Sequence, residues 1–170
     1  MKDRWRARSS GLAIILAVAA IAVLAWTTAS AEAGQALVVR LPDGTRLMSI
    51  PLGAHGEFAL RYRNSLYGSL AEERFTVGAG ERMELVELAA DELAVLEEYY
   101  AIEEPARHAP GGDSRVWTAE PRQPVSLEAL VVAATDLGER TLLVDGQPAM
   151  ELWRLVEDGA ASVVLELEAP

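Results

Sequence analysis

Glu57–Arg63, with the sequence EFALRYR, is the segment that decides the fold class of this chain. Apolar and polar side chains alternate along it, so that two aromatic residues and a leucine share one side while Arg61 and Arg63 share the other. Such alternation is typical of a β-strand with one buried face, because successive side chains point to opposite faces of a sheet. The segment therefore predicts a sheet that covers a core and leaves two arginines on its outer side.

Similar short runs, separated by turn signals, lie on both sides of this segment. Asp43-Gly44 and Asp145-Gly146 are hairpin signals, since Asp-Gly adopts the tight turn that joins antiparallel strands. The strands predicted from these runs are Ala36–Leu41, Arg46–Ile50, Arg74–Val77, Leu130–Ala134, Thr141–Val144 and Val163–Leu167. Frequent short strands with turns between them predict a mainly β fold, an antiparallel sandwich-like or partly closed barrel domain.

The stretch Met83–Tyr100 fits two structures. Leucine, alanine and tyrosine recur in it at helical spacing, and glutamate, leucine and alanine favour a helix. It equally fits two strands broken at Ala89–Asp91. The stretch Glu103–Ser114, which comes next, contains two prolines and two glycines and is therefore predicted to be a loop.

Met1–Ala33 differs from the rest of the chain in composition. Four basic residues precede the uninterrupted apolar run Gly11–Trp26, and small residues follow it up to Ala33. This pattern predicts an N-terminal hydrophobic helix that acts as an export signal, either cleaved as a signal peptide or retained as a single membrane anchor. Both alternatives place residues 34–170 outside the cytoplasm, on the periplasmic side, as one mainly β domain.

The exported part is strongly acidic. The whole chain has 15 basic and 26 acidic residues, and the segment Met1–Ala31 holds four of the basic ones and one acidic one, so its removal leaves 11 against 25 and a net charge of −14. Such a charge disfavours nucleic acid or an anionic membrane surface as a partner, because both bind basic surfaces. The chain has no cysteine, which excludes disulfides, zinc–thiolate sites and cysteine nucleophiles.

Few residues are suited to catalysis or to metal binding. The two histidines, His55 and His108, lie in loop-like surroundings, and no G-x-S-x-G motif surrounds Ser65. A serine nucleophile would need a base and an oxyanion hole, and a calcium loop would need its aspartate-rich string. We therefore predict no catalytic residue, no metal site and no cofactor, and hence a protein that is not an enzyme.

The predicted hairpin Phe58–Phe75 carries the candidate contact residues. It presents Arg61, Arg63, Asn64 and Tyr67 together, which are cationic, polar and aromatic groups on an otherwise acidic domain. Arginine and tyrosine are enriched in binding hot spots. These four residues are therefore the predicted contacts for a ligand or a partner, and a carboxylate group would suit the two arginines.

A structural explanation of the same residues is also open. Arg61 and Arg63 would then form a solvated strand face paired to Glu72 or Glu73 across the hairpin. Asn64 would be a turn residue that binds its own backbone.

Two segments are similar to a known family. The stretch Phe58–Leu66, continuing through Glu72–Val77, resembles a bacterial domain-of-unknown-function family, number 1850, and Arg140–Gly146 resembles the closing hairpin of that family. The similar region extends from about Leu37 to Leu167. Members are typically small exported or anchored proteins, and their genes often lie beside TRAP-type transporters of the TAXI subfamily. The resemblance implies an accessory role in solute uptake, with a TAXI-type solute-binding protein or the TRAP permease as partner.

The chain departs from the family pattern at three positions. Asn64 stands where the family tends to have histidine, Tyr67 where it tends to have glutamate, and Leu70 where it tends to have proline. A site built on that histidine and glutamate would be absent from this member.

These features together predict an exported, non-enzymatic accessory or binding module. Two alternatives stay open on the sequence alone, a structural protein of the cell envelope and, with less support, a hydrolase.

Overall fold

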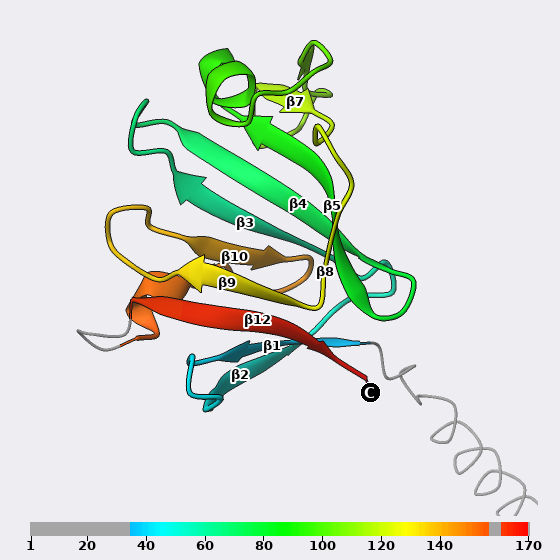
Figure 1. The fold of residues 1–170 in the computed structure, drawn as a ribbon, viewed down its shortest axis with the longest axis vertical. Coiled ribbons are helices and arrows are strands. Elements are labelled where there is room, and N and C mark those ends of the chain that lie inside the picture. The colour runs from blue at the N-terminus through cyan, green and yellow to red at the C-terminus, as the bar shows by residue number, and fades with distance from the viewer. Residues whose placement is uncertain (1–34, 157–160, 170) are drawn as a thin grey trace, which may run out of the picture. The chain divides into compact units, whose positions relative to one another are not determined.

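Two β-sheets make up the domain in the computed structural model, which describes residues 35–156 and 161–169 (Figure 1). The strands of the smaller sheet are β1 (Ala36–Arg40), β2 (Arg46–Pro51), β9 (Ala129–Ala133) and β12 (Ser162–Glu168). Those of the larger sheet are β3 (Glu57–Arg63), β4 (Leu70–Gly78), β5 (Arg82–Ala90), β6 (Arg107–His108), β7 (Trp117–Ala119), β8 (Val125–Leu127), β10 (Thr141–Val144) and β11 (Met150–Glu151). Two short helical segments are η1, a π-helical turn at Val95–Tyr99, and η2, a 3₁₀ turn at Leu152–Arg154.

The strands run antiparallel to their neighbours throughout residues 35–156 and 161–169. The smaller sheet has the order β2-β1-β12-β9, and the larger has the order β11-β10-β3-β4-β5-β7-β6, with β8 beside β5. Both predicted Asp-Gly turns join hairpins, β1 to β2 and β10 to β11. The prediction of a mainly antiparallel β fold is therefore confirmed.

One core cluster contains residues of both sheets. Leu37, Ile50 and Leu165 come from the smaller sheet, and Phe58 and Phe75 come from the larger one. Phe58 and Phe75 are paired across β3 and β4, and their rings stack with centroids 5.0 Å apart. The apolar side of β3 thus faces this core, which is the physical reason for the alternation in its sequence.

A second core cluster lies under η1, at the far end of the larger sheet (Figure 1). Tyr62 and Leu88 from the sheet pack with Val95 and Leu96, which are both fully buried. The turn η1 therefore acts as a cover for this end of the sheet.

The stretch Met83–Tyr100 is neither one helix nor two strands. Its first part belongs to β5, and its last part forms η1. The register between β4 and β5 shifts so that Phe75 pairs with Leu85 while Arg74 pairs with Glu87, which leaves Val86 as an extra residue, a β-bulge. The bulge puts residues 85 and 88 on the same face of a strand. A spacing of three is typical of a helix, and the bulge thereby explains the ambiguous pattern.

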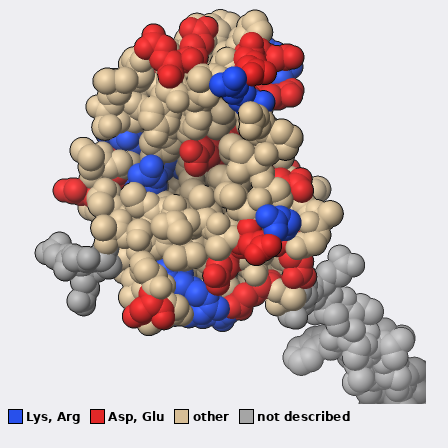
Figure 2. All heavy atoms as spheres, in the orientation of Figure 1, with Lys and Arg blue, Asp and Glu red and all other residues tan. Residues whose placement is uncertain are grey.

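Charged side chains gather at two ends of the face seen in Figure 2, over η1 and over the smaller sheet, with mostly uncharged surface between them. On the smaller sheet, Arg40 forms ion pairs with Glu166 and Glu168, and Arg46 also pairs with Glu168. Val38 lies on the same face of this sheet, paired in register with Glu166, and is fully buried. The ion-paired side chains therefore share this face of the sheet with a buried valine.

The predicted N-terminal hydrophobic helix, Met1–Ala33, lies outside the residues that the structure describes. Within the described part of the chain, no helix has the length and apolar character needed to cross a membrane.

Candidate functional site

The outer face of the larger sheet, opposite its two core clusters, carries a network of paired charges. Arg61 of β3 is paired in register with Glu72 of β4, and Arg74 of β4 is paired with Glu87 of β5. These side chains share a face because their positions alternate with the core residues of each strand. The local sequence thus directs a row of opposite charges onto one surface of the sheet.

Glu72 is the centre of this network and is only 2% exposed. Its carboxylate accepts hydrogen bonds from Arg61 Nε at 2.9 Å, from Arg74 and from the hydroxyl of Ser114 at 3.0 Å. Arg115 adds an ion pair at 3.4 Å. Burial alone would raise the pKa of Glu72, but the hydrogen bonds from Arg61, Arg74 and Ser114 outweigh it and hold that pKa below its ordinary value.

The loop between β6 and β7 brings three further members of the network onto the sheet. Asp113 binds Arg74 in a bidentate way, with distances of 2.8 Å and 2.6 Å. These hydrogen bonds lower the pKa of Asp113 to about 2. Arg115, whose side chain is 9% exposed, pairs with Asp91 at 2.9 Å. We call Arg61, Glu72, Arg74, Glu87, Asp91, Asp113, Ser114 and Arg115 the ionic cluster.

Arg74 uses its whole hydrogen-bonding capacity within the ionic cluster. Its Nε and Nη2 bind Glu72, its Nη1 binds Glu87, and both Nη1 and Nη2 bind Asp113. These five contacts match the five N–H donors that a guanidinium has. Arg74 is therefore a structural cation with no donor left for a ligand.

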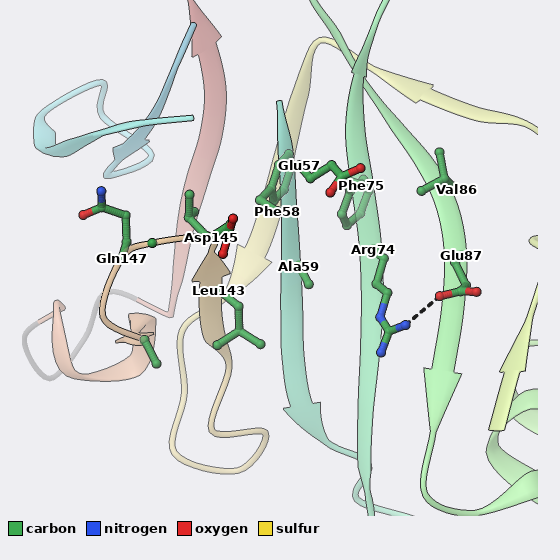
Figure 3. Close-up of a pocket in the computed structure, with 13 residues that line it drawn as sticks. Glu57, Phe58, Ala59, Arg74, Phe75, Val86, Glu87, Leu143, Asp145 and Gln147 are labelled. Atoms are coloured by element: carbon green, nitrogen blue, oxygen red, sulfur yellow. Dashed lines mark hydrogen bonds and ion pairs between the residues drawn. The ribbon is translucent and has the colours of Figure 1, made fainter. Parts of the chain in front are cut away.

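An open groove of about 770 Å³ lies beside the ionic cluster on the outer face of the larger sheet (Figure 3). Ala59 of β3, Leu143 of β10 and Val86 of the β-bulge give it an apolar lining. The Arg74–Glu87 pair, at 2.6 Å, forms a polar wall. We call this feature the outer groove.

Two carboxylates stand at one end of the outer groove. Glu57 and Asp145 directly flank Phe58 and Val144, which are paired in register, so the two acidic residues lie at matching ends of β3 and β10 (Figure 3). Both residues are exposed, and neither forms an ion pair within the described residues. The loop after β10, with Gly146 and Gln147, forms the wall next to them.

The hairpin residues predicted as contacts lie elsewhere. Arg63 pairs with Glu139 at 3.1 Å and also donates to the carbonyl of Gly68. Asn64 is 3% exposed, and its side-chain oxygen accepts hydrogen bonds from two backbone amides of the following turn, those of Leu66 and Tyr67.

The Tyr67 hydroxyl donates to Glu98 at 2.6 Å, and Arg61 belongs to the ionic cluster. Arg61, Arg63, Asn64 and Tyr67 thus all have partners of their own, and none of them lines the outer groove.

A tyrosine pair lies on the inner side of the larger sheet and was not predicted from the sequence. The hydroxyl oxygens of Tyr62 and Tyr100 lie 2.6 Å apart, and Tyr100 donates to Glu73 at 2.7 Å. Burial raises the pKa of Tyr62 to about 12 and raises that of Tyr100 as well. The guanidinium of Arg140 lies 5.2 Å from the centre of the Tyr62 ring. Since the two hydroxyls stay protonated, they tie η1 and the residue that follows it to the sheet.

The two histidines do not come together. His108 stacks on Trp117 with ring centroids 3.9 Å apart, whereas the carbonyl of His55 accepts a hydrogen bond from Thr76. No group of three acidic, histidine or cysteine side chains suited to a metal ion occurs in residues 35–156 and 161–169.

The outer groove and most of the ionic cluster were not predicted from the sequence. Glu57 and Asp145 could hardly be singled out from the sequence, because they stand at strand ends and acidic residues are common in the turns that follow or precede strands. Asp113 belongs to a glycine-rich loop whose position on the sheet no local pattern reveals.

No family model, no curated protein and no solved structure matches this chain.

Proposed function

We propose that this chain is an extracytoplasmic binding module and that the outer groove is its ligand-binding site. The observation that carries the proposal is the groove itself, since its volume of about 770 Å³ falls within the roughly 300–1,000 Å³ typical of small-molecule sites. Apolar side chains beside a few polar groups are also typical of such sites.

A binding role suits the chemistry of the groove better than a catalytic one. Its basic residue, Arg74, is saturated by carboxylates and is held in place by them. A general base or nucleophile needs a partner that positions it and prepares it for proton transfer. Glu57 and Asp145 are exposed, and no hydrogen bond within the described residues orients either side chain toward a reacting group.

The cellular setting belongs to the same proposal. The leader pattern in Met1–Ala33 supports a place on the periplasmic side of the membrane. The resemblance to family 1850 supports an accessory role beside a TAXI-type TRAP transporter.

The hairpin end of the larger sheet is the proposed contact surface for that transport partner. Arg63 and Tyr67 are the side chains to test there, because changing Arg61 would also disturb Glu72. The double variant Arg63→Ala with Tyr67→Phe should reduce solute uptake in a strain that depends on the transporter. Unchanged uptake with normal protein levels would show that the hairpin is not the contact surface for the transport partner.

A fragment screen followed by protein NMR tests the ligand site. The protein is purified as the cell produces it and is exposed to a library of small apolar and polar compounds. Shifts should cluster on residues of the outer groove, such as Ala59 and Leu143. They should be lost in Val86→Trp, which fills the groove from a residue that is 46% exposed.

The matched control is Val131→Trp, a valine on β9 that is 68% exposed and does not line the groove. It should bind the same compounds as the natural chain. Compounds that bind only outside the outer groove, or that bind Val86→Trp equally well, would refute the proposed site.

A further inference from the structure

We infer that the outer groove selects small organic cations that carry an apolar group. The apolar part would lie against Ala59, Leu143 and Val86, and the cationic group would lie between Glu57 and Asp145. This inference rests on the proposed function, because it names the class of ligand for the same groove.

The charge of the groove lining is the first argument. Four of its residues are charged, namely Glu57, Arg74, Glu87 and Asp145, and three of these are acidic. Arg74 already pairs with Glu87 at 2.6 Å, so the two charges of that pair offset each other. The charge that remains for a ligand is therefore negative and comes from Glu57 and Asp145.

The hydrogen-bond capacity of Arg74 is the second argument. A charge-assisted contact to an anionic ligand would need a free cationic donor, and all five N–H groups of this guanidinium are in use. Displacing Asp113 would break two short hydrogen bonds, of 2.8 Å and 2.6 Å, in a partly buried network. The one cation of the groove thus serves the ionic cluster and not a bound anion.

The distribution of the remaining cations is the third argument. Ten arginines in the described residues form ion pairs with carboxylates. Arg140, the remaining arginine of the exported part, lies over the ring of Tyr62. Apart from Arg140, the charged side chains that form no ion pair within the described residues are therefore carboxylates, and two of them flank the groove.

The position of the two carboxylates determines how a ligand would be oriented in the groove. Glu57 and Asp145 lie at one end of the groove, while Val86 and the Arg74–Glu87 pair lie on β4 and β5 (Figure 3). A ligand with an ammonium group at one end and an apolar group at the other would satisfy both parts. Opposite charges in an exposed site attract each other only weakly, so the expected selection is modest.

Three matched probes test this inference on the purified protein. Phenethylammonium, phenethyl alcohol and phenylpropionate share a ring and a short chain, and they differ mainly in charge. Their dissociation constants are measured by NMR titration, following resonances of Ala59 and Leu143. Phenethylammonium should bind about three- to tenfold more tightly than the alcohol, as expected for one or two exposed charge pairs, and phenylpropionate should bind most weakly.

A double variant assigns the selection to the two carboxylates. Glu57→Gln with Asp145→Asn should weaken phenethylammonium binding about three- to tenfold and leave the alcohol unchanged. The control Glu97→Gln with Glu104→Gln removes the same charge from exposed residues that do not line the groove, and it should change neither constant. Raising the salt concentration from 0.1 M to 1 M shortens the screening length from about 10 Å to about 3 Å. This change should reduce the preference of the natural chain for phenethylammonium over phenethyl alcohol. Far-UV circular dichroism verifies that both double variants are folded.

The outcomes separate this inference from the proposed function. If the alcohol or phenylpropionate binds in the groove as tightly as phenethylammonium, groove binding stands and cation selection is wrong. The same holds if the Glu57→Gln, Asp145→Asn double variant keeps the preference. If none of the three probes shifts the groove resonances, cation selection is wrong. If, in addition, Val86→Trp abolishes the binding of no library compound, the proposed site is overturned as well.

Discussion

At the scale of single residues, the neighbours Glu72 and Glu73 show how β4 places two carboxylates in different surroundings. Glu72 faces outward into the ionic cluster, and Glu73 accepts a hydrogen bond from Tyr100 on the inner side. The alternation of strand side chains separates them completely. Both are polar groups in a partly apolar setting, and such groups persist only where hydrogen bonds satisfy them.

Replacing Glu72 should strongly destabilise the domain. The change Glu72→Gln leaves Arg61, Arg74 and Arg115 without their shared carboxylate. Breaking a buried pair costs about 3–5 kcal/mol, and because these arginines are partly exposed we expect a loss of about 2–4 kcal/mol in the free energy of unfolding. Chemical denaturation measures it. The control is Glu73→Gln, in which the amide oxygen can still accept from Tyr100, and an equal loss there would contradict the central role of Glu72.

The hydroxyl of Tyr100 should also contribute to stability. Tyr100→Phe removes its contacts with Tyr62 and Glu73 and leaves both without that partner, which should lower the free energy of unfolding by about 1–2 kcal/mol. Tyr99→Phe is the matched control, because Tyr99 is 57% exposed and should be replaceable at almost no cost. Thermal unfolding of the two variants side by side decides the matter, and similar midpoints would argue against the tyrosine pair.

At the scale of elements, the loop between β6 and β7 is held on the sheet by charge more than by apolar packing. Asp113 binds Arg74 of β4, Ser114 binds Glu72, and Arg115 binds Asp91 at the end of β5. A loop fixed in this way depends on the ionisation of its carboxylates. The same contacts hold Arg74 against the edge of the outer groove, so the loop and the groove are coupled through one side chain.

Acid should release this loop. The pKa of Asp113 is about 2 in the folded protein, below the roughly 3.9 of an unfolded aspartate. A lowered pKa contributes stability that is present above the unfolded value and is lost as the pH falls toward the folded value. Stability should therefore decline between about pH 4 and pH 2, and limited proteolysis with pepsin should cut near Gly111 and Gly112 first. Asp113→Asn should make stability depend less steeply on pH in this range. An unchanged slope of stability against pH would contradict the role given to the Asp113 carboxylate.

At the scale of the whole molecule, two sheets share a core while charge is organised on their outer faces. Ion pairs share a face with the buried Val38 on the smaller sheet, and the other members of the ionic cluster surround Glu72 on the larger one. The outer groove is the part of the larger sheet beside that cluster which the loop between β6 and β7 leaves open. The remaining excess of acidic residues gives the open surface a negative charge.

The location of the chain is testable at this scale as well. The basic residues before Gly11 should keep the N-terminus in the cytoplasm and send the rest outside. Alkaline phosphatase fused after Pro170 should therefore be active, and a fluorescent protein that matures only in the cytoplasm should be dark there. The reverse result would refute the proposed extracytoplasmic location.

The regular structure was largely predictable, whereas the outer groove and most of the ionic cluster were not. The range Glu57–Arg63 matches β3 residue for residue, and Thr141–Val144 matches β10. The β-bulge at Val86 misled the pattern in Met83–Tyr100, because an inserted residue changes the spacing of core side chains. The candidate contacts Arg61, Arg63, Asn64 and Tyr67 were chosen by residue type, which does not reveal the partners that a side chain finds within its own fold.

Strand alternation and Asp-Gly turns act over a few residues, so the linear order of amino acids was enough to decide that this chain forms short antiparallel strands. The ionic cluster and the outer groove depend on residues that are far apart in the chain, such as Arg74 and Asp113, which are 39 positions apart. Glu57 and Asp145 come together only because β3 and β10 pair in one register. Charge compensation and groove shape are set by such distant contacts, and for that reason only the packed sheets could decide which carboxylates are bound internally and which remain available to a ligand.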